Sequence, residues 1–315
     1  MTTTMRTPDH EQEIEHLDIP DPRPSRLSRV MVLVIVVVPF IATLAAAVGF
    51  FGTGAFDLTL TVVFMAVSGL GITAGYHRLF THKSFVANRP LKIGLVIAGS
   101  LAFQGDLMSW VANHRQHHRH PDRDGDPHSP LRPDGGAWGK ACGLFHSHVG
   151  WLLTSGQRHD DRVVADLYAD RDLRILAPLF PLWATLGLIA PFFIGLAVGG
   201  TFGAALSAFV WAGLVRVFLM HHITWSINSV CHAFGTRPFR TGDASRNVRL
   251  LSVFTLGESW HNAHHAFPTL ARHGVDRGQI DPTGRLIWLW EKLGWATEVR
   301  WARPELLATR RVDTA

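Results

Sequence analysis

Apolar residues in this chain gather into long blocks separated by polar segments, and they do not recur at the period of an amphipathic helix or strand. Four of these blocks approach the roughly 20 residues with which a helix crosses the hydrocarbon core of a bilayer. They lie near residues 30–50, 58–76, 175–198 and 203–222. The pattern therefore predicts four transmembrane helices.

Three histidine clusters stand beside these blocks: HRLFTH at 77–82, HRQHH at 114–118 and HNAHH at 261–265. Imidazole is a favoured ligand of iron, copper and zinc. Together the clusters hold more imidazoles than one metal ion can bind. They therefore predict two metal ions beside a membrane, acting on an apolar substrate.

A fifth apolar block, near 91–108, is interrupted by glycines and by polar residues such as Lys92, Gln104 and Asp106. If it crossed the bilayer, the histidine clusters at 77–82 and 114–118 would lie on opposite faces of the membrane and could not share a site. We therefore expect an interfacial helix at 91–108.

The basic residues indicate an orientation. None of the 30 Lys and Arg falls in the short turns near 51–57 and 196–203, and only Arg216 lies within a predicted span. Because basic residues stay on the cytoplasmic side, we expect both termini and every histidine cluster at the cytoplasmic face of the inner membrane. The charge is dispersed around the spans, so membrane lipid, and not nucleic acid, is the expected counter-charge.

Three regions follow from this organisation. Residues 1–28 are polar and are expected to form a mostly disordered cytoplasmic tail, 29–270 a membrane domain, and 271–315 a C-terminal part of a cytoplasmic cap. Cys142 and Cys231 form no CxxC motif, and no structural disulfide is expected in a reducing compartment. The predicted fold class is an all-α membrane protein with four transmembrane helices and a cytoplasmic helical cap.

Helical geometry explains the HxxHH spacing. The first histidine shares a face with the two others, at i+3 and i+4, while the adjacent pair diverges by about 100°, so one helix can present ligands to two metals. Pro121 and Pro268 follow these motifs, where helices tend to stop. His77 and His82 are five apart, on different sides of an α-helix, so we expect the second span to end or unwind between them.

A further stripe lies at the end of the fourth span, where His221, Trp225, Asn228 and His232 fall at i, i+4, i+7 and i+11. We expect His232 to bind metal directly, Asn228 to bind it through water, and Trp225 to line the substrate channel. For His221 and His222, a role in the site and an interfacial role bonded to backbone or lipid stay open. Supporting or solvated positions are expected for the other loop histidines: His120, His128, His146, His148, His159 and His273.

The donor set favours iron over zinc. Structural zinc prefers closed sets of four ligands with Cys, and catalytic zinc keeps three ligands and a water. Activating oxygen against an unreactive C–H bond needs a metal that changes oxidation state. Ferritin-like proteins use paired Glu-x-x-His motifs. Here Glu258 and His261 have that spacing, but the other such pair, Glu13 and His16, lies in the tail. Glu258 is therefore expected to orient a ligand histidine.

These motifs resemble those of the membrane fatty acyl desaturases, specifically the stearoyl-CoA delta-9 type. The similarity runs from about Gly71 to Pro268. It rests on GITAGYHRLFTH, WVANHRQHHRH followed by DPHS, FHSHVGWLL at 145–153, NSVCHAFGTRPF at 228–239 and GESWHNAHHAFP at 257–268. The NSVCH element favours this branch over related membrane hydroxylases.

The resemblance implies a non-haem di-iron centre that uses O2 and two electrons to convert a saturated long-chain acyl group, with acyl-CoA favoured, into a cis-monounsaturated one. It implies nine iron ligands: His77, His82, His114, His117, His118, His232, His261, His264 and His265. Outer positions around them are assigned to Asn228, Glu258 and Asp106. A kinked tunnel would select the carbon, and its expected wall includes Leu70, Thr73, Ala74 and Trp225. For Leu70, Thr73 and Ala74, ordinary helix packing inside the bilayer stays an alternative.

The segments that hold the acyl carrier in animal members differ here. Ala112 replaces an Arg before HxxHH, and residues 154–157 replace basic residues after GWLL. Candidate phosphate contacts are then Arg115, Arg119 and Arg158. A phospholipid-linked chain stays an alternative to acyl-CoA. The insertion 131–143 is expected to be a surface loop, with a lid or a donor-docking loop as the alternative.

Two other functions stay open. A membrane fatty acid or alkane hydroxylase would use the same metal pair. A metal transporter or storage protein would place its ligands at mid-membrane within broken helices, whereas these nine stand at the ends of spans. The sequence holds no CxxC-rich iron–sulfur region, haem-binding domain or GxGxxG motif. Electrons are therefore expected from a separate reductase, ferredoxin or similar donor.

Overall fold

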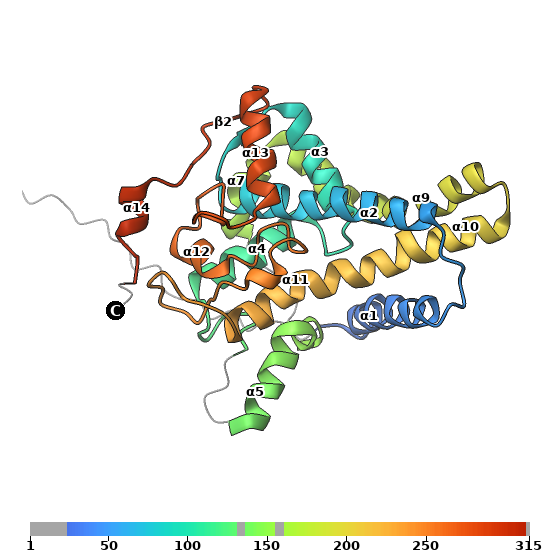
Figure 1. Cartoon of the computed structure of the whole chain (residues 1–315), viewed down its shortest axis with the longest axis horizontal. Coiled ribbons are helices and arrows are strands. Elements are labelled where there is room, and N and C mark those ends of the chain that lie inside the picture. Colours follow the sequence, from blue (N-terminus) through green and yellow to red (C-terminus); the bar gives the residue numbers. More distant parts are fainter. Residues whose placement is uncertain (1–23, 131–135, 155–160, 313–315) are drawn as a thin grey trace, which may run out of the picture.

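The computed structural model describes residues 24–130, 136–154 and 161–312. Most of the predicted tail, 1–23, lies outside these ranges. Among the described residues, four helical stretches are long and apolar enough to cross a membrane: Arg26–Ala47, Ala55–Thr81, Arg171–Gly199 and Phe202–Ala233. They run side by side, and the shorter elements gather at one end of them (Figure 1). The predicted all-α architecture with four spans is confirmed, and it fits an integral membrane protein.

The four stretches are not uniform α-helices. The first is α1 (Arg26–Ala47), and the second joins α2 (Ala55–Leu70) to a π-helical segment, Gly71–Thr81. The third joins α8 (Arg171–Leu176), a 3₁₀ turn at Ala177–Leu179 and α9 (Phe180–Gly199). The fourth joins α10 (Phe202–Ala208), a π-helical segment at Phe209–Val215 and α11 (Arg216–Ala233). The second and fourth stretches continue past the apolar blocks and into the cap.

The described part of the cap consists of short helices and one small sheet. Its helices before the third span are α3 (Arg89–Ser100), α4 (Leu107–Arg119), α5 (Gly136–Phe145), the π-turn His146–Gly150, α6 (Trp151–Thr154), the 3₁₀ turn Asp161–Val164 and α7 (Ala165–Ala169). Those after the fourth are the 3₁₀ turn Arg249–Leu251, α12 (His261–Ala266), α13 (Pro282–Lys292) and α14 (Pro304–Ala308). Strands β1 (Val86–Ala87) and β2 (Ala296–Thr297) pair antiparallel.

The sequence predicted one interfacial helix at 91–108. The structure instead divides this block between two helices, α3 and α4. Helix α3 ends at Ser100, and Phe103 and Gly105 take positive φ angles of 63° and 99°. The chain then turns into α4, where Asp106 Oδ1 accepts hydrogen bonds from the backbone N–H groups of Met108 and Ser109. Asp106 is therefore the N-cap of α4. It also lines the cavity between the spans, and its expected outer role at a metal site stays a prediction.

The insertion at 131–143 also differs from the expected surface loop. Residues 131–135 lie outside the described ranges, but Gly136–Phe145 forms helix α5. It projects from the cap beside the end of α11 (Figure 1). Helix α5 leads through the π-turn at His146–Gly150 into α6.

Arg216 ties two spans to the end of α3. Its side chain is fully buried, and its guanidinium donates to the carbonyl oxygens of Ala212 at 3.1 Å, Leu101 at 2.5 Å and Gly187 at 2.9 Å. Because a charged donor inside a bilayer must be satisfied by protein groups, these carbonyls explain how an arginine lies within the fourth stretch.

The second stretch and α3 touch through their backbones. A Cβ atom on Gly71 would lie 2.0 Å from the backbone nitrogen of Gly99, and one on Gly99 would lie 2.3 Å from the ring of Tyr76. Only glycine at both positions allows this approach, which holds the π-helical segment against the cap.

We therefore expect Gly71→Ala to lower the thermal midpoint of unfolding, because α3 must move away and overpacking typically costs about 1–3 kcal/mol. The matched control is Gly94→Ala, in α3 itself, whose Cβ would meet no atom within 4 Å. Tryptophan fluorescence monitors the thermal unfolding of both variants in detergent, and their midpoints are compared. Equal midpoints for the two variants would contradict this account of the packing.

Candidate metal centre and cavity

The structure brings the nine histidines expected as ligands into two adjacent groups. Within each group the candidate ligand atoms all lie within 4.8 Å of one another. The first group has five members, His77, His82, His114, His118 and His264. The second has four, His117, His232, His261 and His265. Rings from the second stretch, α4, α11 and α12 thus meet although they are far apart in the sequence.

Each HxxHH helix serves both groups. In α4, His114 and His118 belong to the five-histidine group and His117 to the four-histidine group. In α12 the assignment is reversed: His261 and His265 belong to the four-histidine group, and His264 to the five-histidine group. The i, i+4 pair shares a face in both helices. Both helices therefore lie between the two groups.

His77 and His82 come together through a widened helical turn. The second stretch ends between them, at Thr81, as expected, but its last part is a π-helix, which the sequence did not predict. The backbone N–H of His82, the C-cap residue, donates to the carbonyl of His77 at 3.1 Å. A π-helix has i→i+5 bonds and a wider turn than an α-helix, so residues five apart share a face. The two ring centroids are 4.8 Å apart.

Four of these histidines face a carboxylate through Nδ1. The pairs are His77 with Glu258 at 2.7 Å, His117 with Asp126 at 3.0 Å, His232 with Asp122 at 2.9 Å and His265 with Asp243 at 2.8 Å. Carboxylates in this position fix the tautomer and orientation of metal-binding imidazoles. Glu258 lies beside a candidate ligand, as expected, but this ligand is His77 and not the sequence neighbour His261.

The sequence reasoning missed three of these carboxylates, Asp122, Asp126 and Asp243. Asp122 and Asp126 follow the first HxxHH motif closely, in PDRDGDPHS, and that proximity was a signal. Asp243 stands in a loop without a motif, and no local pattern marks it.

Burial and neighbouring charges set the protonation of the site. In the five-histidine group, burial lowers the pKa of four imidazoles well below the usual value, and neighbouring histidines lower it further. These four are His82, His114, His118 and His264. In the four-histidine group, burial lowers the pKa of His265 to about 4, although Asp243 opposes this shift. Burial raises the pKa of Asp243, but the hydrogen bond and charge of His265, together with hydrogen bonds from Ser245, outweigh burial and lower this pKa. In this pair a neutral imidazole faces an ionised carboxylate.

The Nε2 atoms show that these residues fit metal ions. His117 and His265 each turn Nδ1 to an aspartate, and their Nε2 atoms face each other at 3.3 Å. If both Nδ1 atoms carry the proton, two lone pairs meet there, and no hydrogen bond can form between them. Two nitrogens bound at right angles to one ion at about 2.1 Å lie about 3.0 Å apart. In the other group, Nε2 of His264 lies at similar distances from two other Nε2 atoms, 3.1 Å from that of His77 and 2.9 Å from that of His118.

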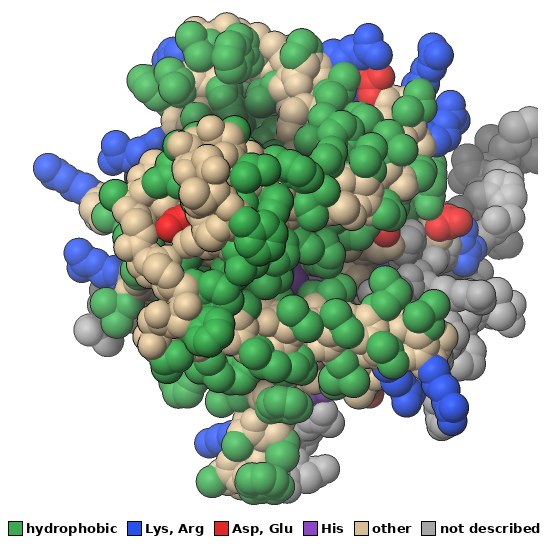
Figure 2. All heavy atoms as spheres, turned by 90° about the vertical axis from the view of Figure 1, so that its right-hand side faces the viewer, with side chains coloured by type: hydrophobic (Ala, Val, Ile, Leu, Met, Phe, Trp, Pro, Cys, Tyr) green, Lys and Arg blue, Asp and Glu red, His purple; other side chains and the backbone are tan. Residues whose placement is uncertain are grey.

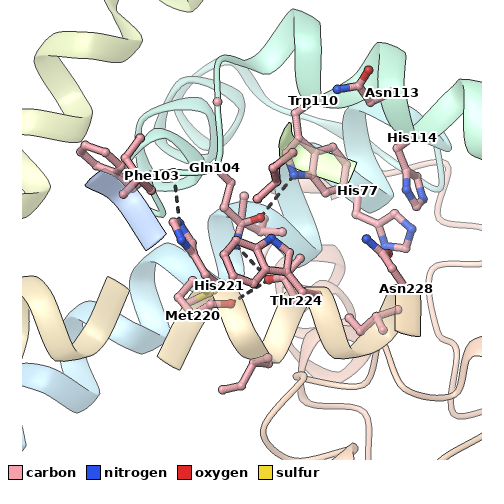
Figure 3. A pocket seen from close by; sticks show the side chains of 18 of the residues that line it. His77, Phe103, Gln104, Trp110, Asn113, His114, Met220, His221, Thr224 and Asn228 are labelled. Atoms are coloured by element: carbon pink, nitrogen blue, oxygen red, sulfur yellow. Dashed lines mark hydrogen bonds between the residues drawn. The ribbon is translucent and has the colours of Figure 1, made fainter. Parts of the chain in front are cut away.

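A cavity of about 940 Å³ leads to both groups. Its wall includes His77 and His114 from the five-histidine group and His261 from the four-histidine group. Figure 3 shows His77 and His114 at one side, Asn228 pointing toward them from α11, and His221 at the other side. The cavity extends between the spans to apolar residues of α1, α2 and α9, among them Met31, Met65 and Ala184.

The wall agrees only in part with the predicted channel. Thr73 and Trp225 line the cavity, as does Asn228. Leu70 and Ala74, also expected there, are not among the lining residues. Ala74 is fully buried within the π-helical segment instead. The widened turn of that segment changes which side chains face inward, and a sequence pattern based on an α-helix does not predict this change.

The other histidines that the structure describes stand outside the two groups. Nε2 of His221 lies 2.9 Å from the carbonyl oxygen of Phe103, while His222 Nδ1 lies 2.9 Å from His148 Nε2. His273 lies 3.1 Å from Glu258, and His128 lies 3.5 Å from Asp126. Thus His128 and His273 lie beside the carboxylates that face the groups. His159 lies outside the described residues.

Of the three arginines expected at a carrier phosphate, one is engaged within the cap. Arg115 pairs with Asp166 at 2.6 Å and donates to the carbonyl oxygens of Phe80 and Val163. Arg119 is exposed at the end of α4. Arg158 lies outside the described residues.

Comparison with known proteins agrees with this site. The family model for fatty acid desaturases matches residues 55–279. The chain is 38% identical to the sn-1 stearoyl-lipid 9-desaturase of Anabaena variabilis, over 76% of this chain and 82% of that protein. It is 35% identical to the hex-5-enoyl-[acyl-carrier protein] acetylenase of Moorena producens, over 88% of this chain and 87% of that protein. A probable acyl-CoA desaturase of Schizosaccharomyces pombe is 35% identical, over 76% of this chain and 48% of that protein.

Proposed function

This chain belongs to the fatty acid desaturase family and is an oxidoreductase, and we propose that it converts a saturated long-chain acyl group into a cis-monounsaturated one, at the delta-9 position, at a di-iron centre. The observation that carries the proposal is the apolar cavity whose wall includes histidines from both groups. Two iron ions held there would supply the redox chemistry with O2, using two electrons from a separate donor.

The chain's own residues have three tasks in this function. We propose that the nine histidines bind the two ions, and that Glu258, Asp122, Asp126 and Asp243 hold four of the rings in orientation through Nδ1. Asn228 lines the cavity, and we propose that it binds a metal ion through a water molecule. The apolar wall, with Trp225, holds the acyl chain so that one pair of methylenes lies beside the metal pair.

One observation bears on the carrier of the acyl chain. Acyl-CoA, which the resemblance favoured, carries phosphates that need cationic partners. Among the described residues, the cavity wall contains no Lys or Arg, and Arg115 is held by Asp166. The relative from Anabaena variabilis is named a stearoyl-lipid 9-desaturase, and one from Arabidopsis thaliana, 38% identical, is named a delta-9 acyl-lipid desaturase. We therefore propose a lipid-linked acyl chain as the substrate, with acyl-CoA as the second candidate.

The basic residues support the proposed orientation. Figure 2 views the end of the molecule opposite the cap, where hydrophobic side chains predominate and Lys and Arg stand at the margin. By the positive-inside rule, we propose that the cap, the site and both termini face the cytoplasm of the inner membrane. A soluble reductase or ferredoxin would then reach the site from the same compartment.

Expression in a desaturase-deficient host tests the function. We expect new monounsaturated chains in total lipid by gas chromatography with mass spectrometry, and none with His265→Ala. A hydroxylated product, which is heavier than the monounsaturated product by the elements of water, would favour the hydroxylase alternative. Absence of any product from iron-loaded protein with a reductase would refute the proposal.

The carrier is tested with purified protein in nanodiscs. Labelled stearoyl chains are offered either as stearoyl-CoA or on phosphatidylglycerol, with the same reductase. We expect product only from the lipid-linked chain. Product from stearoyl-CoA alone would overturn the choice of carrier but not the desaturase function.

A further inference from the structure

Helix α5 presents an uncovered apolar face. Trp138 is 80% exposed and Phe145 is 63% exposed. Ala141 and Cys142 are also exposed between them. These four residues fall at i, i+3, i+4 and i+7, so they form one stripe along the helix. Two large aromatic side chains on one exposed stripe are typical of a surface that contacts something apolar.

The other faces of α5 have different characters. Gly143 is buried and Gly139 is half-buried, and this side packs toward α11. Lys140, the one charged residue in the helix, lies about 200° around the axis from Trp138. An aromatic face opposite a basic residue is the pattern of a helix that lies in a membrane interface.

The position of α5 agrees with that pattern. In Figure 1 it runs across the direction of the long helices, near the end of the bundle where α1 begins at Arg26. Figure 2 looks along the long helices from the end opposite the cap, and there the helix that projects at the bottom shows hydrophobic side chains toward the viewer. That is the side which a bilayer around the spans would occupy.

We propose that α5 is an interfacial anchor, with Trp138, Cys142 and Phe145 in the boundary between acyl chains and headgroups and Lys140 toward anionic headgroups. The anchor is continuous with the substrate cavity, because α5 leads through the π-turn at 146–150 to Trp151, which lines the cavity. It therefore fixes one part of the cavity wall at the level of the headgroups. A soluble partner would approach from the opposite, aqueous side.

The native cysteines provide the test. Cys142 is exposed on the apolar stripe, and Cys231 is fully buried, so a nitroxide reagent attaches at Cys142 without any substitution. The full chain is reconstituted in vesicles of phosphatidylcholine and phosphatidylglycerol. Electron paramagnetic resonance then compares relaxation by O2, which concentrates in lipid, with relaxation by a water-soluble nickel complex. We expect the Cys142 label to be several-fold more sensitive to O2 than to nickel.

The matched control is Lys140→Cys in a Cys142→Ser background, which moves the label to the opposite face. We expect this label to prefer the nickel complex. Equal nickel accessibility at both positions would overturn the proposal. A Cys142 label shielded from both reagents would also overturn it, because that result indicates a protein contact on the stripe. Neither readout depends on activity, so failure here is distinct from failure of the proposed function.

Discussion

His265→Ala is expected to lower the iron content from about two ions per chain to about one and to abolish turnover, because it removes one of four nitrogens from the smaller group. His264→Ala removes one of five nitrogens from the other group. Adjacent residues should thus affect different ions. Iron analysis of the purified variants and product analysis by gas chromatography measure both effects.

The spectroscopic difference between the two variants sharpens this test. Each should retain one ion in a different ligand set, so Mössbauer spectra of ⁵⁷Fe-loaded protein should show two distinct single-site signals. His120→Ala is the control, because His120 stands at the end of α4 outside both groups. It should keep both ions. Activity above a few per cent in either His264→Ala or His265→Ala would remove that residue from the ligand set.

Arg78→Met is expected to destabilise the folded protein by about 3–5 kcal/mol, because it leaves buried carboxylates without their partner. Arg78 is fully buried, lies 2.9 Å from Glu258 and 3.1 Å from Asp281, and donates to the carbonyl of Ala271 at 2.7 Å. Burial raises the pKa of Glu258, but Arg78, together with His77 and His273, outweighs burial and holds this pKa well below its usual value. Thermal unfolding with metal removed measures the loss.

This substitution should also act on the metal site. Glu258 lies 2.7 Å from Nδ1 of His77, so a displaced or protonated Glu258 no longer orients that ring. Iron affinity should fall by about 10- to 100-fold, measured by competition with a chelator. Arg89→Met is the control: Arg89 pairs with Asp172 at 2.9 Å, but its side chain is 74% exposed and solvent screens the pair. If both variants unfold alike, the buried network has no special part in stability.

Local patterns were enough to predict the spans and the candidate ligands. Apolar length marks a bilayer-crossing helix whatever surrounds it, and each of the four predicted blocks coincides with one long apolar helical stretch, although the fourth stretch continues to Ala233, well past the predicted end at 222. Pro121 and Pro268 predicted where helices stop, and α4 and α12 end at Arg119 and Ala266. The HxxHH spacing and the family resemblance supplied the nine histidines that the structure brings together.

Other features depend on which segments pack together, and local patterns do not carry that information. The π-helix that aligns His77 with His82 gives up regular α-helical bonding for a close approach to α3 at Gly71. Helical spacing says that His264 and His265 diverge, but not which group receives each. Asp243 faces His265 only because a distant loop folds over α12.

The sequence by itself therefore determined the kind of protein: a four-span membrane chain with histidines typical of a metal site, because hydropathy and helical periodicity act over neighbouring residues. Only the tertiary structure decided the division of nine rings into five and four, the carboxylates behind them and the wall of the cavity. Those features arise where distant segments meet, and their geometry is set by packing between helices.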